Sequence, residues 1–428
     1  MRPSVALCSA SLVLSLAACS DSTTWAGTVT DSAGVTVVHN PAVGIWSVSD
    51  AWTLEEELKV GAIEGDPEYL FGRIGSVDAD SRGRIFVLDA QAQHVRVYSS
   101  LGQYEQTFGG PGAGPGELGP EPAALYLGPG DTLLVLDLSN QRVNRYAPNG
   151  TSVGSFRFAF ENGLPLAITV TRAGVIAAQV RPLALPGQAE ADSLDAILIL
   201  DPEGAVLDTL TRFPSGGTMR LGGSQPEITV FAAEPVWQLT DAGSLCYGAN
   251  KEYRLEFYAR DGILERIITR SFVPRSIAEE DQEVMLSLFD EQLRATVPPQ
   301  AFEQARAQVR EMVRFADHYP AFARVLVGPR NSVWVQHIPL PSELTDEERV
   351  SWNFMDVLTG VSWNLIEDIG APDWDVFGAD GRFLGTVTMP LRFSPRTIIG
   401  DKIYGVWRDE LEVQYAVRLG IIGIQETE

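Results

Sequence analysis

Basic residues are scarce in this sequence, and their scarcity bears on the class of partner. The 428 residues include 32 lysines and arginines against 56 aspartates and glutamates, which gives a formal net charge of −24. A protein that binds nucleic acid needs a basic surface for the phosphate backbone, so we expect no nucleic acid partner. With 45% apolar and 21% charged residues, the chain is expected to fold as a globular protein.

Cysteine and histidine are scarce as well. Two of the three cysteines fall within the first 19 residues, so no internal disulfide is expected in the rest of the chain. The third, Cys246, lies in the alternating run SLCYG, which favours a small buried residue over a catalytic thiol. The histidines show no pair at metal-ligand spacing, so we expect no zinc site at His39, His94, His318 or His337.

The N-terminus reads as a targeting segment. Arg2 precedes an apolar run over residues 5–16, which is too short to span a bilayer, and Leu16-Ala17-Ala18-Cys19 follows. This tetrapeptide resembles the lipobox of bacterial lipoproteins, which implies that residues 1–19 are a signal peptide with its lipobox and that Cys19 carries a lipid. An ordinary cleaved signal peptide or an uncleaved apolar start is the alternative. By the same resemblance, Ser20 after the cysteine implies sorting to the outer membrane, facing the periplasm or the cell surface.

Internal repetition determines the expected fold. The segments GRIFVLDAQAQHVRVYSSLG and DTLLVLDLSNQRVNRYAPNG match in register. An aromatic or aliphatic residue followed four positions later by a turn glycine recurs as Tyr98/Gly102, Tyr146/Gly150, Leu200/Gly204, Tyr258/Gly262 and Phe377/Gly381. A second family of tight turns lies in DSRGRIFV, GPGDTLLV, TRAGVIAA, TDAGSLCY, GPRNSVWV and IGDKIYGV.

Two hairpins per unit give four antiparallel strands, and six such units predict an all-β, six-bladed β-propeller over residues 52–420. The sixth unit ends after its third strand, so we expect residues 52–60 to close the ring as its outermost strand. Residues 20–51 are an N-terminal linker with a lead-in strand at 28–39, which either adds to a blade edge or leads from the lipid anchor. Residues 421–428 are a C-terminal tail.

The glycine-rich stretch GGPGAGPGEL raises the question of a phosphate-binding loop. It lacks the Lys-Ser/Thr that such a loop needs, and its Glu117 has a counterpart at Glu68 in the preceding unit. We interpret it as a connector between blades, with a glycine-rich anion nest as the alternative.

A family resemblance agrees with this fold. The repeats, the GAGPGEL connector and the ending FGADGRFLGTVTMPLRFSPRTIIGDKIYGVWRDELEVQYAVRL resemble bacterial six-bladed β-propeller lipoproteins related to NHL repeats. The resemblance covers nearly the whole mature chain and implies the fold, but no particular activity.

The long insertions are expected on one face of the propeller. In a blade, the first–second and third–fourth turns lie on one face, and the second–third turns and interblade connections lie on the other. All long segments of this sequence belong to the second group, at residues 181–192, 213–226, 274–319 and 339–372. Loops on a rigid scaffold carry function, so we expect the ligand-binding face there.

The insertion at residues 274–319 reads as a helical hairpin lying across the propeller mouth. Ser276 and Glu279 form a capping box, and the first helix has an apolar stripe of Val284, Leu288 and Phe289.

Two groups of side chains in the insertions have alternative interpretations. The second helix carries Arg306, Arg310 and Arg314 on one face. These arginines either pair with acidic neighbours or clamp an acidic ligand. The insertion at 339–372 carries aromatic residues that either pack on the propeller or bind an apolar or sugar ligand, namely Trp352, Phe354 and Trp363.

A polar residue ends the second strand of each blade on the insertion-bearing side. In chain order these are Asp89, Asp137, Gln179 or its neighbour, Asn250, His337 and Asp409. Such a ring could coordinate Ca²⁺ or another divalent cation, with Asp89, Asp137 and Asp409 as candidate ligands. The alternative is that each side chain accepts hydrogen bonds from its own turn.

Two functions from different classes follow. The first is a lipid-anchored binding or scaffold protein of the bacterial envelope, which takes a protein, peptide or glycan partner through the insertion-bearing face. Its candidate contact residues are Asp89, Asp137, Asn250, His337, Asp409, Arg306, Arg310, Trp352 and Trp363. The second is a metal-dependent, lactonase-like propeller hydrolase or lyase with a divalent cation in the central channel.

Overall fold

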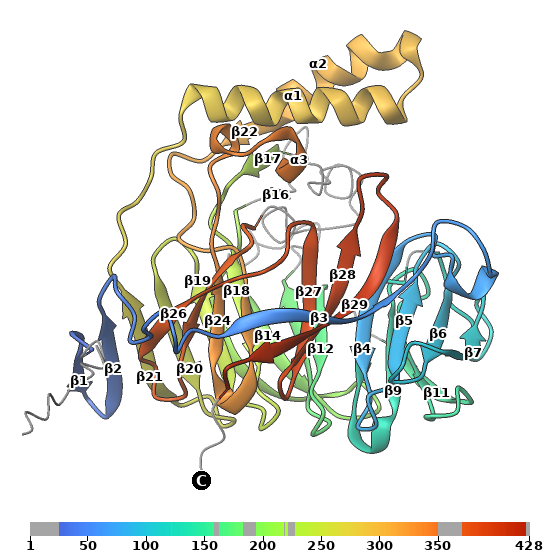
Figure 1. Ribbon diagram of the computed structural model, residues 1–428, viewed down its shortest axis with the longest axis horizontal. Helices are drawn as coiled ribbons and strands as arrows, with labels where there is room; N and C mark the ends of the chain where they lie inside the picture. Colours follow the sequence, from blue (N-terminus) through green and yellow to red (C-terminus); the bar gives the residue numbers. More distant parts are fainter. Residues whose placement is uncertain are drawn as a thin grey trace, which may run out of the picture.

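The chain forms six antiparallel sheets arranged around a central axis, as the computed structural model shows (Figure 1). The structure describes residues 25–120, 122–157, 162–182, 194–217, 219–220, 227–349 and 370–424. Each sheet pairs consecutive antiparallel strands, so the six-bladed β-propeller predicted from the repeats is confirmed.

The blades follow one another along the chain, each from its innermost to its outermost strand. Blade one is β4 (Ile74–Ala79), β5 (Ile85–Asp89), β6 (His94–Tyr98) and β7 (Tyr104–Gly109). Blade two is β8 (Ala124–Leu127), β9 (Leu133–Asp137), β10 (Arg142–Tyr146) and β11 (Ser152–Arg157). Blade three is β12 (Leu164–Val170), β13 (Ile176–Arg181), β14 (Leu194–Leu200) and β15 (Val206–Pro214).

The second half of the ring repeats this order. Blade four is β18 (Pro235–Leu239), β19 (Leu245–Ala249), β20 (Arg254–Tyr258) and β21 (Leu264–Arg270). Blade five is β23 (Val325–Val327), β24 (Val333–Gln336), β25 (Asp373–Phe377) and β26 (Phe383–Thr388). Blade six is β27 (Phe393–Ile399), β28 (Lys402–Arg408), β29 (Gln414–Ile422) and, from the N-terminal part of the chain, β3 (Thr53–Val60).

Further elements decorate the ring. A small sheet consists of β16 (Met219–Arg220), β17 (Glu227–Val230) and β22 (Val313–Phe315). The α-helices are α1 (Glu279–Thr296), α2 (Phe302–Met312) and α3 (Asp346–Arg349). Short 3-10 turns are η1 (Pro67–Tyr69), η2 (Pro129–Asp131), η4 (Pro299–Ala301), η5 (Pro329–Asn331) and η6 (Pro341–Glu343).

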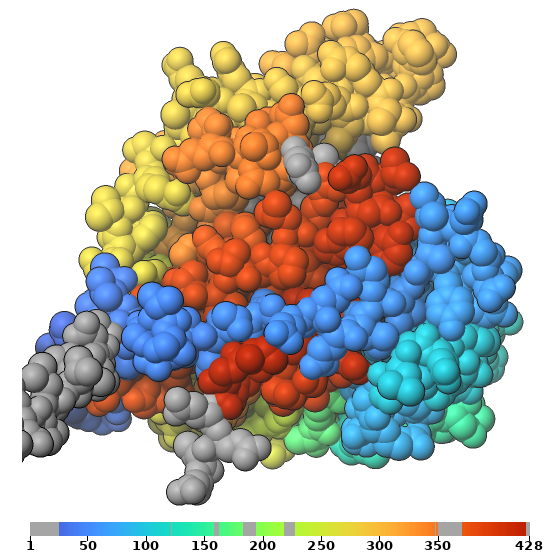
Figure 2. Space-filling view, in the orientation of Figure 1, coloured from blue at the N-terminus to red at the C-terminus, as the bar shows by residue number. Residues whose placement is uncertain are grey.

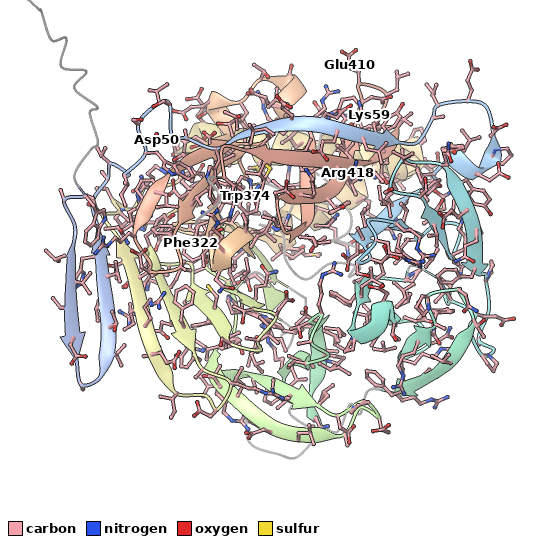
Figure 3. The ribbon with its side chains drawn as sticks, turned by 60° about the horizontal axis from the view of Figure 1, so that its bottom comes forward. Asp50, Lys59, Phe322, Trp374, Glu410 and Arg418 are labelled. Carbon is pink, nitrogen blue, oxygen red and sulfur yellow. The ribbon has the colours of Figure 1, made fainter. Side chains whose placement is uncertain are left out.

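The ring is closed by an N-terminal strand, as predicted. Strand β3 pairs antiparallel with β29 from Val60↔Ala416 to Thr53↔Ile422. Glu57 joins the strands through its carboxylate, which accepts hydrogen bonds from Lys402 Nζ at 2.5 Å and Arg418 Nε at 3.0 Å. Figure 3 shows Lys59 and Arg418 on these adjacent strands. Closure covers the edge of β29 that would otherwise be left unpaired.

The lead-in strand at residues 28–39 adds to a blade edge. Strands β1 (Thr28–Ser32) and β2 (Val35–Asn40) form a hairpin, and β2 pairs in parallel with β21, the outermost strand of blade four. Of the two placements that the sequence allowed, the structure shows the first.

The repeated turn glycines seal neighbouring blades. All five have a positive φ, and each turn packs against the outermost strand of the preceding blade, at Gly102, Gly150, Gly204, Gly262 and Gly381. At Gly150, with φ +80, an added Cβ would lie 2.5 Å from Phe108 of β7. Glycine is required there both for its backbone conformation and for the close contact.

The hydrophobic core is divided among the spaces between blades. Six of the clusters among the described residues each join two neighbouring blades, and a seventh lies beneath the helices. Phe322 lies between blades four and five and Trp374 between blades five and six, both fully buried (Figure 3). Burial of a side chain of this size contributes about 1.5–3 kcal/mol.

The helical hairpin lies on one side of the ring, above the small sheet (Figure 1). The predicted helical insertion on one face is therefore confirmed, but two predictions about its first helix are wrong. Helix α1 begins after Ala278 without a side-chain cap, whereas Ser276 forms a backbone bridge with His318. Its buried stripe is Met285, Phe289 and Leu293 rather than the stripe that starts at Val284.

Figure 2 shows the helices and the C-terminal strands together covering that end of the molecule. Beneath them, β17 and β22 form a parallel pair that the sequence gave no reason to expect.

We predict that Gly150→Ala lowers the free energy of unfolding by at least about 2 kcal/mol, because the new Cβ meets Phe108 and the backbone is left-handed. Gly130→Ala is the matched control, since Gly130 also has a positive φ but an added Cβ would meet nothing within 4 Å. It should cost about 1 kcal/mol. Urea unfolding of both variants tests this, and equal losses would contradict the sealing role of the turn.

Candidate functional site

The predicted polar ring holds the blades together locally. The Asp89 carboxylate accepts hydrogen bonds from the backbone N–H of Gly72 at 3.0 Å and of Ala92 at 3.0 Å. Asp137 repeats the pattern one blade on, with Gly119 at 3.1 Å and Asn140 at 3.1 Å. Each aspartate therefore ties the end of the second strand to the segment that leads into its own blade.

The other members of the ring also have partners within the protein. Asn250 accepts from the Glu234 N–H at 2.7 Å and donates to the Phe322 carbonyl at 2.8 Å. Asp409 accepts from the N–H groups of Leu411 and Val413 at 2.8 and 2.9 Å, in the turn that it begins. The side chains of Asp89, Asp137 and Asn250 are fully buried, so a ligand on the surface does not reach them.

A metal centre lacks a supporting cluster. Among the described residues, no group of three or more histidine, cysteine, aspartate or glutamate side chains is placed to hold an ion. Asp89, Asp137 and Asp409 each serve a different blade, and the structure does not bring their carboxylates together. The alternative interpretation, in which each aspartate binds its own turn, describes all three.

His337 belongs to a buried network centred on Asp375. The Asp375 carboxylate lies 2.9 Å from His337 Nε2, accepts from the Tyr253 hydroxyl at 2.6 Å and pairs with Arg270. Thr386 Oγ1 donates a further hydrogen bond at 2.9 Å. The network joins blades four and five at the level of the insertions.

The charge state of Asp375 follows from this environment. Burial raises the pKa of Asp375, but the hydrogen bond and charge of His337, together with Arg270 and Tyr253, outweigh it. The pKa therefore lies below its ordinary value of 3.8. Burial and the adjacent Asp375 carboxylate raise the pKa of Tyr253 well above 10.0, so its hydroxyl stays a donor.

The arginines of α2 pair with the first helix. Arg306 Nε lies 3.0 Å and Arg310 Nη2 2.7 Å from the same oxygen of Asp290 on α1. Arg314 donates to the backbone carbonyls of Glu311 and Val313. Of the two interpretations, pairing with acidic neighbours describes Arg306 and Arg310, and the pairs hold the two helices together.

The glycine-rich connector binds its own carboxylate. The Gly114 N–H donates to Glu117 Oε2 at 2.7 Å, and Arg142 donates to the carbonyls of Ala113 and Glu117. Tyr146 in blade two donates to the Gly116 carbonyl at 3.0 Å, as Tyr98 does to the Glu68 carbonyl one blade earlier. The stretch is a connector between blades, as predicted.

Several predicted positions lie outside the described residues. These are the lipidation residue Cys19 with the rest of residues 1–19, and the aromatic candidates Trp352, Phe354 and Trp363. Their roles stay predictions.

Sequence reasoning missed two buried acids. Asp195 is fully buried and accepts from Arg181 at 2.8 and 3.0 Å and from Gln179 at 2.7 Å. Asp375 also lies in the third strand of its blade. An acid inside an apolar strand run, as in LDAILIL and DWDVF, is the signal that marks both.

A cavity lies along the axis of the ring, where the second predicted function placed a central channel. The innermost strands of the blades surround a space of about 840 Å³ that extends along the axis of the ring. At one end the cavity is lined by residues just before the innermost strands, such as Arg73 and Arg324. At the other end it is lined by the turns that follow these strands, which include Arg172 and Arg330. The first end lies on the insertion-bearing side.

The fold and this cavity define the class of protein as a six-bladed β-propeller with an axial ligand-sized space. No protein-family model matches the sequence. No curated protein matches it either.

Solved structures resemble the chain at low identity. A Bacteroides fragilis protein whose name marks it as exported is 10% identical, with 92% of this chain and 100% of that chain covered and a TM-score of 0.48. A member of the DUF4221 family from Bacteroides vulgatus is 11% identical, with 87% and 99% covered and a TM-score of 0.49. Virginiamycin B lyase from Staphylococcus aureus is 10% identical, with 87% and 100% covered and a TM-score of 0.42. Likenesses this distant transfer no activity.

Within the described residues, no helix has both the length and the apolar character needed to cross a membrane.

We predict that Asp375→Asn lowers the free energy of unfolding at pH 7 by about 3 kcal/mol, because it leaves Arg270 without its buried partner. A carboxyl with a lowered pKa stabilises the fold above its ordinary pKa of 3.8, and this stabilisation is lost as the pH falls. The difference from wild type should therefore shrink below about pH 4.

Asp373→Asn, in the same strand, is the control, since Asp373 is bonded to Thr388 at an exposed site and should cost less than about 1 kcal/mol. Thermal unfolding between acidic and neutral pH gives the comparison. A gap between Asp375→Asn and wild type that is independent of pH would argue against a charged Asp375.

Proposed function

We propose that this chain is a lipid-anchored protein of the bacterial envelope that binds a protein, peptide or glycan ligand at its insertion-bearing face. The supporting observation is that the described insertions and one end of the axial cavity share a face. The helical hairpin, the small sheet and the loop from β28 to β29 all rise on this side (Figure 1). Loops carried on a rigid scaffold are the usual place for recognition.

The position of the N-terminal hairpin supports this orientation. Strands β1 and β2 lie at the rim of the ring, away from α1 and α2 (Figure 1). Trp25, the first described residue, packs over Arg382 in the plain-face turn of blade five, with 4.8 Å between the guanidinium and the ring. A chain anchored through its N-terminus can thus leave the insertion-bearing face open to a ligand.

The exposed surface of this face supplies apolar contacts. Leu411, in the loop between β28 and β29, is 71% exposed, and Leu391 nearby is also exposed. Trp407 packs beneath them, where its Nε1 donates to the Leu391 carbonyl at 3.1 Å. Exposed apolar side chains beside a cavity are suited to a partner that buries them.

Lipid attachment at Cys19 gives a direct test of the anchor. In cells expressing the full chain, Cys19→Ala should abolish incorporation of an alkyne-labelled fatty acid and move the protein from the membrane to the soluble envelope fraction. Cys246→Ala is the control and should leave both unchanged, because Cys246 is buried and burial raises its thiol pKa to about 12. Labelling that persists in Cys19→Ala would rule out this anchor.

A second test addresses the binding face. Purified protein is screened by biolayer interferometry against immobilised envelope glycans, peptides and proteins. Leu411→Glu should weaken the strongest specific interaction by about tenfold, as expected when a charge enters an apolar contact. Leu101→Glu is the matched control on the plain face, where Leu101 is 76% exposed in the turn between β6 and β7, and it should change affinity less than about twofold. Equal effects of the two variants would place the ligand elsewhere.

A further inference from the structure

The axial cavity is basic although the protein is strongly acidic. Among the described residues, seven arginines and three acids line it, whereas the whole chain carries a net charge of −24. The three acids are Asp78, Glu234 and Asp241. A cavity with low-dielectric walls focuses the field of the charges that line it, so this excess attracts anions from an otherwise repulsive surface.

The charge is not spread evenly along the axis. At the plain-face end, Arg172 pairs with Asp78 at 2.5 Å, and Arg330 and Asp241 lie in the neighbouring turns, so charges of both signs balance. Among the described residues at the insertion-bearing end, Glu234 lies with five arginines, which are Arg73, Arg181, Arg324, Arg396 and Arg408. Of the described charged side chains at this end, arginines are therefore the majority.

The charge of Arg181 is neutralised by an aspartate of the neighbouring strand. Its guanidinium makes two hydrogen bonds to the fully buried Asp195. The other four arginines come from blades five, six and one, which are consecutive around the ring, so they form an arc on one side of the cavity mouth. Three of them, Arg73, Arg324 and Arg408, have partners within the protein.

Arg396 occupies a special place in this arc. The register of β27 against β28 shifts between Pro395 and Thr397, so Arg396 is the extra residue of a β-bulge. Strands β4 and β12 have the same shift at Gly75 and Leu166, which also line the cavity. A bulge redirects a side chain, and blade six places a guanidinium where blades one and three place uncharged residues.

The Nε of Arg396 has no acceptor among the described residues. This atom is buried, and none of the described carboxylates lies within ion-pair distance of it. A buried charged donor without an acceptor is costly, which is why such groups usually have partners.

Arg324 is held beside it. This nearly buried arginine donates from Nη2 to the Pro395 carbonyl at 3.0 Å, at the residue that precedes Arg396. Arg324 is thus tied to the backbone beside Arg396, and both residues line the cavity.

We propose that this arc binds a small anionic ligand whose carboxylate or phosphate group accepts hydrogen bonds from Arg396 and Arg324. The proposal rests on the proposed function and specifies the ligand chemistry at the same face. A guanidinium fork matches the two oxygens of a carboxylate or phosphate. A cavity of about 840 Å³ is in the range that holds a complete small molecule, such as a sugar acid or the acidic end of a glycan.

Isothermal titration calorimetry on the detergent-solubilised full chain tests the proposal. Glucuronic acid, glucose and inorganic phosphate are the probes, and glucuronic acid differs from glucose in its carboxylate. We expect saturable binding of glucuronic acid, no binding of glucose, and weaker binding as salt rises from about 20 to about 150 mM. Stronger binding of phosphate than of glucuronic acid would identify the phosphate group as the preferred anion.

Two arginine variants locate the site. Arg396→Gln should weaken binding of the anion by at least about tenfold, because it removes a charged donor that has no other partner. Arg330→Gln, at the opposite end of the same cavity, should change binding less than about twofold. Arg396→Gln should also melt no lower than wild type, since it removes a buried Nε donor that has no partner among the described residues, so lost binding is not lost folding.

Three results would overturn the inference: no acidic probe binds, Arg396→Gln binds as wild type does, or the two variants weaken binding equally. Failure of the inference is distinguishable from failure of the proposed function. If Leu411→Glu selectively weakens a partner while no acidic probe binds, the binding face stands and the anion site does not. If an anion binds through Arg396 while Leu411→Glu and Leu101→Glu act alike, the anion site stands and the proposed binding face does not.

Discussion

The pairing of β3 with β29 is the constraint on which the rest of the structure depends. It joins residues near the two ends of the chain, so blade six is completed and every blade is held between two neighbours. Val60 at its inner end is 2% exposed and packs in the cluster that joins blades six and one. Because the ring is closed, the innermost strands are held apart around an axis, and the space between them persists as a cavity.

Polar residues repeated in every blade serve the architecture first. Asp89 and Asp137 bind the backbone where the chain enters their blades, and Tyr98 and Tyr146 bind the connectors that precede them. Repetition therefore marks structural residues in this fold. Residues that break the repeat are better candidates for function, and Arg396 is one of them, because the corresponding bulges in blades one and three carry glycine and leucine.

The fold was predictable from the sequence because its signals are local. Turn glycines such as Gly102 and Gly150 recur with the blade, and a missing last strand implied closure by residues 52–60. The candidate site was much less predictable. The arc of arginines depends on the β-bulge at Arg396 and on the contact of Arg324 with Pro395, and both are set by register and by the meeting of two blades. No pattern within one strand encodes either.

Other features escaped prediction for the same physical reason. The parallel pair of β17 and β22 joins segments far apart in the sequence, and the start of α1 at Glu279 is decided by tertiary packing and not by the Ser276 capping signal. Buried Asp375 gathers partners from β21 and β26, from the residue before β20 and from the residue after β24. Such sites exist only once the ring has formed.

The account as a whole describes an acidic propeller in which an arc of arginines lines one end of the axial cavity, on the side where its insertions stand. Crystals of the full chain soaked in selenate provide the most direct test, since selenium scatters anomalously and selenate presents the oxygens of a small dianion. The account predicts an anomalous peak within hydrogen-bonding distance of Arg396 and Arg324. Selenate bound at plain-face turns while this end of the cavity stays empty would contradict it.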